Sequence, residues 1–218
     1  MLELPLVRDW RLRLSVAAMV ENHVYKWLHE WGWVPLNIAV CEENLRVLHR
    51  VFAEHEVPFW LEHGTSLGVV REGGIIPYDD DVDIGMWGKY RDTFLDHILP
   101  DLRKEGFYVG QVKGHTFFVL LRKGEKVDVS MIDTHSPGAM CDAPGSKKDM
   151  DTCAKQAYYM RRVRPVTFLG RTFWVPPDDY MVYGYGNNWR THDWRRDCKK
   201  SLAGKTTCVD TAPPSSPA

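Results

Sequence analysis

The alternation of apolar and polar positions predicts a series of helices and short strands. Apolar residues recur at helical spacing in segments 15–31 and 40–56, and the second segment carries charged residues on its other faces. Further helices are predicted at 67–71, after a turn at 63–66, at 89–104, and from 176 to about 186. Short apolar runs between turn residues predict strands at 59–61, 82–87, 107–112, 116–121 and 126–132, and a hairpin of 166–168 with 171–175. This order predicts an α/β fold with one mixed sheet flanked by helices.

The same pattern divides the chain into three parts. Residues 1–39 form an N-terminal helical extension, whose helix at 15–31 we interpret as a docking helix covering a core. A membrane-surface helix is the alternative, and a polar face that is not strongly basic disfavours it. Residues 40–198 form the domain that carries the sheet, and residues 199–218, with their Pro, Ser and Thr, form a disordered tail.

Composition narrows the class of protein. The 218 residues are 44% hydrophobic, which is enough to bury a core, and Trp87 and Trp174 are expected inside it rather than on a sugar-binding platform. Lys plus Arg number 28 against 29 for Asp plus Glu, and this balance argues against general nucleic-acid binding.

No segment has the roughly 20 apolar residues that span a bilayer, and no signal peptide is recognisable. A cytoplasmic location is therefore favoured, while a location in the Golgi lumen stays open if the chain is a fragment. The five cysteines include no C-x-x-C and no zinc-site spacing. Cys198 and Cys208 could pair in an oxidising compartment, and free thiols are equally compatible with their spacing.

Four carboxylates are crowded into the stretch PYDDDVDIGM, at the start of the predicted strand 82–87. Side chains of a strand alternate between its two faces, so Asp81 and Asp83 share one face while Val82 and Ile84 point into the core. Two such carboxylates repel each other, and desolvation adds to the cost. A divalent cation resolves this conflict, and oxygen ligands of this kind suit Mg²⁺ or Mn²⁺.

Asp128 is the predicted third ligand, since it lies between two valines on the strand 126–132. If that strand lies beside 82–87, the carboxylates of Asp81, Asp83 and Asp128 converge, as metal-assisted phosphoryl transfer requires. One carboxylate could also orient or deprotonate an attacking hydroxyl. A salt-bridged surface position is the alternative for Asp128, and a solvated turn is the alternative for Asp79 and Asp80.

Gly64, Thr65 and Ser66 form a small turn before a predicted helix, a place where backbone N–H groups and hydroxyls can bind a phosphate. An ordinary helix N-cap is the alternative. Arg71 could grip a phosphate with its guanidinium, or form a surface ion pair. An EF-hand is excluded because Ile84 stands where the loop needs glycine, and neither a P-loop nor a G-x-G-x-x-G motif occurs.

The stretch from His63 to Met86, HGTSLGVVREGGIIPYDDDVDIGM, resembles the signature of the LicD family. This family includes bacterial phosphocholine transferases, fukutin and fukutin-related protein. Ser66 stands where the family often has Leu, and Tyr78 where it usually has Trp. The segments 175–180 and 183–189 resemble the family's closing segment, a proline-led helix ending in Y-G-x-x-W, so the resemblance spans roughly residues 40–190.

The resemblance implies a nucleotidyltransferase fold and a metal-dependent transferase. By position, Asp81 and Asp83 match the family's metal-binding D-x-D, Asp128 matches its third carboxylate, and Gly64 with Thr65 or Ser66 matches its nucleotide-phosphate turn. The implied reaction moves phosphocholine or an alditol phosphate such as ribitol phosphate from a CDP-activated donor to a glycan hydroxyl and releases CMP. Two alternatives stay open: a nucleotidyltransferase proper, which attaches a nucleoside monophosphate to a small molecule or protein, and a non-catalytic member that binds glycan or nucleotide.

Overall fold

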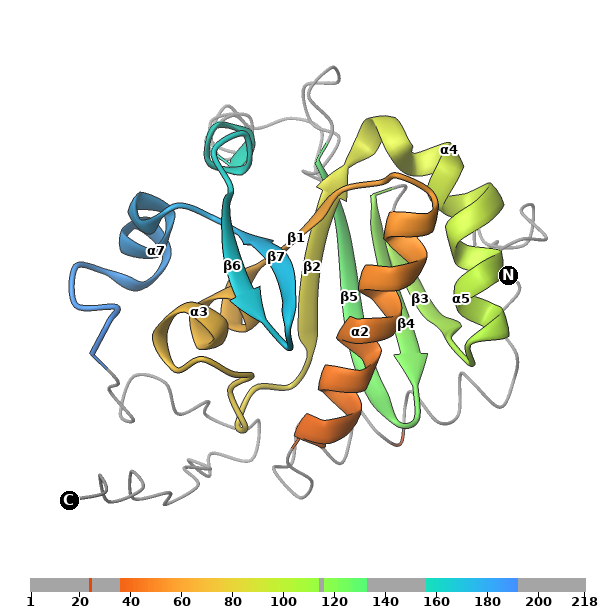
Figure 1. Ribbon diagram of the computed structural model, residues 1–218, viewed down its shortest axis with the longest axis horizontal. Coiled ribbons are helices and arrows are strands. Elements are labelled where there is room, and N and C mark those ends of the chain that lie inside the picture. The colour runs from red at the N-terminus through yellow and green to blue at the C-terminus, as the bar shows by residue number, and fades with distance from the viewer. Residues whose placement is uncertain (1–23, 25–35, 114–115, 133–155, 192–218) are drawn as a thin grey trace, which may run out of the picture.

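The computed structural model describes residues 24, 36–113, 116–132 and 156–191 (Figure 1). Of the N-terminal extension predicted at 1–39, it covers residues 24 and 36–39. The tail predicted at 199–218 lies outside the described residues, as do Cys198 and Cys208.

One five-stranded mixed sheet forms the centre of the fold. Its order is β1 (Phe59–Leu61), β2 (Val82–Trp87), β5 (Glu125–Ile132), β4 (Phe117–Arg122) and β3 (Tyr108–Lys113). The pair β2–β5 is parallel, and the three other pairs are antiparallel. The mixed α/β prediction is confirmed, and each of the five strands lies within one residue of its predicted bounds.

The main hydrophobic core covers one face of this sheet. The helices α2 (Ile38–Glu54), α4 (Arg91–Thr93) and α5 (Leu99–Lys104) lie together on that face (Figure 1). Alternate strand residues point into it, and they are Val82, Ile84 and Met86 of β2 and Val127, Val129 and Met131 of β5. The residues between them, Asp83 and Asp128 included, therefore belong to the opposite face.

The helix predicted at 89–104 is not uniform. It runs as a 3₁₀ turn η3 (Gly88–Tyr90), then α4, a π-helical segment η4 (Phe94–Ile98) and α5. Pro100 lies in the first turn of α5, directly after the π-helical segment. Because proline has no N–H to donate and crowds the carbonyl four residues earlier, the wider π turn accommodates it without ending the helix.

The opposite face of the sheet carries the second, smaller apolar cluster. It is covered by α3 (His63–Arg71), α7 (Asp178–Tyr185) and a helical segment at 156–160, while the hairpin β6 (Arg164–Phe168) and β7 (Arg171–Val175) lies against β1. Two predictions are corrected here. The helix predicted from residue 67 begins at His63, so the expected turn at 63–66 is its first turn. Trp174 is 41% exposed rather than buried, because its neighbours on β7 take the inward positions.

Candidate metal and substrate site

Three carboxylates meet on the face of the sheet opposite the main core. Asp83 of β2 and Asp128 of β5 are register partners across the parallel pair, and Asp81 directly precedes β2. One carboxylate oxygen from each of the three residues lies within 4.8 Å of the other two. The convergence expected for strands lying side by side is therefore present, and the role of these residues as metal ligands stays a prediction.

The negative charge of this cluster is only partly compensated. Burial, followed by the nearby carboxylates of Asp81 and Asp128, raises the pKa of the Asp83 carboxyl well above its ordinary value. The Lys126 ammonium lies 2.6 Å from Asp81 Oδ2 and 3.5 Å from Asp128 Oδ2. Burial alone would lower the pKa of Lys126, but these carboxylates raise it above its usual value. The oxygen donors and the residual repulsion at Asp83 fit a hard divalent cation such as Mg²⁺ or Mn²⁺.

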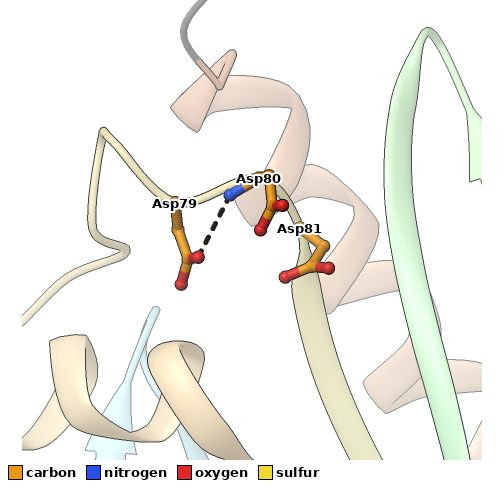
Figure 2. Close-up of side chains that lie close together, drawn as sticks. All are labelled: Asp79, Asp80 and Asp81. Carbon is orange, nitrogen blue, oxygen red and sulfur yellow. Dashed lines mark hydrogen bonds between the residues drawn. The ribbon is translucent and has the colours of Figure 1, made fainter. Parts of the chain in front are cut away.

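Asp79 and Asp80 extend the cluster along the loop before β2. The backbone N–H of Asp80 donates to Asp79 Oδ1 at 3.1 Å (Figure 2). A second group of carboxylate oxygens, from Asp79, Asp80 and Asp81, also lies within 4.8 Å of one another. Asp79 reaches the first turn of α3, where a Cβ placed on Gly64 would lie 1.9 Å from Asp79 Oδ2. Gly64 is therefore required for this close approach of a carboxylate to the N-terminal end of a helix, where anions are favoured.

A cavity of about 560 Å³ opens beside these carboxylates. Its acidic side is formed by Asp79, Asp80, Asp81 and Asp83, and its apolar and aromatic side by Leu67, Ile76, Tyr78, Tyr185 and Trp189. Gly64 and Arg71 also line it, and the phosphate-binding role predicted for them from the sequence stays a prediction. The Arg71 guanidinium donates to Glu72 Oε1 through Nε at 3.0 Å, so a substrate phosphate would share it with that carboxylate.

Thr65 and Ser66 are not among the described residues that line the cavity. Both are buried in α3. The Thr65 hydroxyl accepts the backbone N–H of Asp83 at 2.8 Å, and the Ser66 hydroxyl donates to the His63 carbonyl at 2.9 Å. In this geometry both hydroxyls are bonded to backbone groups of the protein, at Asp83 and at His63.

Glu62 is a buried carboxylate at the site that sequence reasoning missed. Its Oε1 accepts the Trp60 Nε1–H at 2.7 Å, and its Oε2 accepts the Ser130 hydroxyl. The side chain thereby crosses β2 above Gly85 and joins β1 to β5. The available signal was an acidic residue placed directly after the apolar strand residues Phe59–Leu61.

Lys126, Tyr185 and Trp189 were also not assigned to the site from the sequence. Lys126 is two residues from Asp128 on the same strand, so the alternation of side chains could have placed both on one face. Tyr185 and Trp189 belong to the segment 183–189 that resembles the family's closing motif, and they line the same cavity as the carboxylates.

Comparison with known sequences decides the family. The LicD/FKTN/FKRP nucleotidyltransferase domain matches residues 56–178, which is more than half of the chain. The chain belongs to this family. The resemblance found in the His63–Met86 stretch is thereby confirmed, and the matched range includes every site residue predicted from the sequence.

Individual LicD-family relatives match over shorter stretches. An uncharacterized protein of Rickettsia typhi is 31% identical over 122 residues, covering 50% of this chain and 38% of that protein. The ribitol-5-phosphate transferase FKTN of Mus musculus is 46% identical over 62 residues, covering 28% of this chain and 12% of that protein. The chain thus spans less than half the length of these curated relatives.

Among solved structures, the lincosamide antibiotic adenylyltransferase LnuA with bound lincomycin aligns with a TM-score of 0.47 and 14% identity. The alignment covers 67% of this chain and 87% of that one.

Among the described residues, no helix has both the length and the apolar character needed to cross a bilayer.

The raised pKa of Asp83 predicts a pH-dependent stability for this LicD-family domain. An unfolded Asp titrates near pH 4, so folding raises the pKa and the folded state holds the proton more tightly. The resulting stabilisation is complete below about pH 4 and is lost as pH rises through the pKa of the folded state. We expect the melting temperature in EDTA to fall as pH rises above about 4, and to fall more steeply for wild type than for Asp83→Asn.

A divalent cation should reverse this trend. The stabilisation by Mg²⁺ should grow with pH, because fewer protons compete for the same oxygens. Thermal unfolding at several pH values, with EDTA and with excess MgCl₂, measures both effects. Parallel pH curves for wild type and Asp83→Asn would contradict the prediction.

Proposed function

We propose that this domain catalyses metal-dependent transfer of a phospho-substituent, phosphocholine or an alditol phosphate, from a CDP-activated donor to a glycan hydroxyl. The convergence of Asp81, Asp83 and Asp128 beside a cavity of about 560 Å³ carries the proposal. Membership of the LicD family and partial similarity to ribitol-5-phosphate transferases support it. All three carboxylates are present, which favours a catalytic member over one that only binds glycan or nucleotide.

The three carboxylates would hold Mg²⁺ or Mn²⁺, and the ion would neutralise charge on the donor pyrophosphate and on the leaving group. The N-terminal turn of α3 at Gly64 and the Arg71 guanidinium offer N–H groups to phosphate oxygens. The aromatic wall of Tyr185 and Trp189 offers apolar surface to the rest of the donor. These residues position the donor, which is the main contribution of a protein to phosphoryl transfer.

In the proposed reaction, the acceptor hydroxyl oxygen bonds to the phosphorus that carries the choline or alditol. The bond from that phosphorus to the bridging oxygen breaks, and CMP leaves with the electron pair. The hydroxyl proton passes to a carboxylate of the cluster acting as general base.

A binding and product experiment tests the proposal. The candidate donors are CDP-choline, CDP-ribitol and CDP-glycerol, with CTP, ATP and UDP-sugars as comparisons, each with Mg²⁺, Mn²⁺ or EDTA. We expect a metal-dependent rise in melting temperature with one CDP-linked donor, absent from the Asp81→Asn/Asp83→Asn double variant. Released nucleotide, identified by ³¹P NMR, should be CMP. A well-folded sample that binds no nucleotide would overturn the proposal.

The second candidate is a nucleotidyltransferase proper, favoured by the match to a family domain described as a nucleotidyltransferase domain. It would use the same carboxylates but would break the bond between the α-phosphorus and the pyrophosphate group. Binding of CTP or ATP without binding of CDP-linked donors, together with release of pyrophosphate, would select this reaction over the first.

A further inference from the structure

The Asp83 backbone lies at the point where β1 leaves the sheet. The antiparallel pairing of β1 with β2 runs Phe59 to Met86, Trp60 to Gly85 and Leu61 to Ile84, and ends there. The next residue, Glu62, still donates its N–H to the Asp83 carbonyl at 3.0 Å. Its own carbonyl is used differently, because it accepts the Ser66 N–H at 2.9 Å as the first hydrogen bond of α3.

The chain turns sharply at this position. His63 has a φ of 41°, in the left-handed region that side-chain-bearing residues seldom adopt, and α3 begins at this residue. The carbonyl that would have continued the ladder to β2 is thereby turned into the helix. The backbone N–H of Asp83 therefore needs another acceptor, because an unpaired N–H in a buried strand is costly.

Thr65 supplies that acceptor. Its hydroxyl lies 2.8 Å from the Asp83 nitrogen, and Thr65 itself is 1% exposed. The N–H and C=O of Asp83 are thus both bonded by the beginning of α3, one to a side chain and one to a backbone group. Across β2 the same residue is in register with Asp128, so fixing its backbone also fixes the separation of two carboxylates of the cluster.

We propose that Thr65 is a positioning residue of the metal centre, which holds Asp83 opposite Asp128 by accepting its backbone N–H. The inference rests on the proposed metal site and gives Thr65 a role other than contact with substrate. Groups that orient metal ligands without touching the metal typically change metal affinity by about 10- to 100-fold when removed. The hydroxyl is the required group, so Ser should replace Thr and Val should not.

The test compares Thr65→Val with Thr65→Ser in binding of Mn²⁺ alone, measured by titration calorimetry without nucleotide. We expect Thr65→Val to weaken Mn²⁺ binding by about 10- to 100-fold and Thr65→Ser to remain within about threefold of wild type. Asn44→Ala is the control for general loss of stability. Asn44 is buried in α2, on the face of the sheet opposite the carboxylates, and bonds Arg122, so its removal should lower stability without changing Mn²⁺ affinity.

Unchanged Mn²⁺ affinity in Thr65→Val, with weaker binding of the nucleotide donor, would overturn the inference and make Thr65 a substrate-binding residue. Hydrogen exchange of the Asp83 amide in EDTA separates this question from the proposed function. Protection should fall by about tenfold or more in Thr65→Val alone. If wild type bound no Mn²⁺, the proposed metal site would be wrong. The selective loss of amide protection in Thr65→Val would still show that Thr65 positions Asp83. Unchanged protection of the Asp83 amide in Thr65→Val would overturn the positioning role.

Discussion

Replacing Asp83 with Asn is expected to abolish metal-dependent turnover and yet leave the metal-free protein at least as stable as wild type. Asn keeps the size of the side chain and removes its charge, so one of the three anionic ligands is lost. Since a bound cation supplies several kcal/mol of transition-state stabilisation, and each 1.36 kcal/mol is tenfold in rate, kcat should fall on the order of 10³-fold or more. Stability should not fall, because the raised pKa of Asp83 reports a carboxylate that is disfavoured in the folded state.

Steady-state kinetics with Mg²⁺ and thermal unfolding in EDTA measure the two halves of this prediction. Asp92→Asn is a matched control, because the Asp92 side chain is 92% exposed on α4 and lies outside the site. It should leave both quantities unchanged. Full metal-dependent turnover by Asp83→Asn would refute the assignment of this residue to the metal site, and a large loss of stability would refute the account of its charge.

Gly85→Ala is expected to destabilise the domain strongly. Gly85 lies on β2 between β1 and β5, directly beneath the Glu62 side chain. An added Cβ would lie 2.3 Å from Trp60 Nε1 and 2.4 Å from Glu62 Oε1, closer than such contacts allow. Neither neighbour can move freely, because both are almost fully buried and bonded to each other at 2.7 Å.

The expected loss is about 3 kcal/mol, at the upper end for an overpacked buried site. That corresponds to a melting temperature lower by roughly 6–12 °C for a domain of this size. Gly74→Ala is the matched control, because no atom lies within 4 Å of its Cβ position, and it should be neutral or slightly stabilising. Equal melting temperatures for the two variants would contradict the packing of Trp60 and Glu62 over β2.

Much of the fold was predictable, because strand alternation is a local signal. Val82, Ile84 and Met86 are buried in the main core, while Asp83 is on the other face, as period-two alternation requires. The start of α3 was not predictable, since Gly64 and its neighbours are poor helix formers and their burial against β2 decides their conformation.

The site itself was predictable only if the strand that carries Asp128 lies beside the strand that carries Asp83. Asp128 joins Asp81 and Asp83 because β5 lies parallel to β2, and that pairing joins strands far apart in the sequence. Glu62 accepts a hydrogen bond from Ser130, and Lys126 forms an ion pair with Asp81. Both contacts join residues on or next to different strands, so the spacing of residues along the sequence does not reveal them. Their roles depend on the order of strands in the sheet. The period of apolar residues along a strand shows which face of the sheet each side chain lies on, but not which strand pairs beside it.

The parallel pairing of β2 with β5 also bears on the order in which this domain folds. The helices α4 and α5 and the antiparallel strands β3, β4 and β5 can form from local contacts, whereas β2 must wait for β5 to be positioned beside it. Pairings between distant segments carry a loop-closure cost and form slowly. A nascent chain that has emerged only as far as β4 carries Asp81 and Asp83 but lacks Asp128. Binding of a cation through all three carboxylates therefore requires this long-range pairing, and a chain that ends before β5 holds only part of the candidate site.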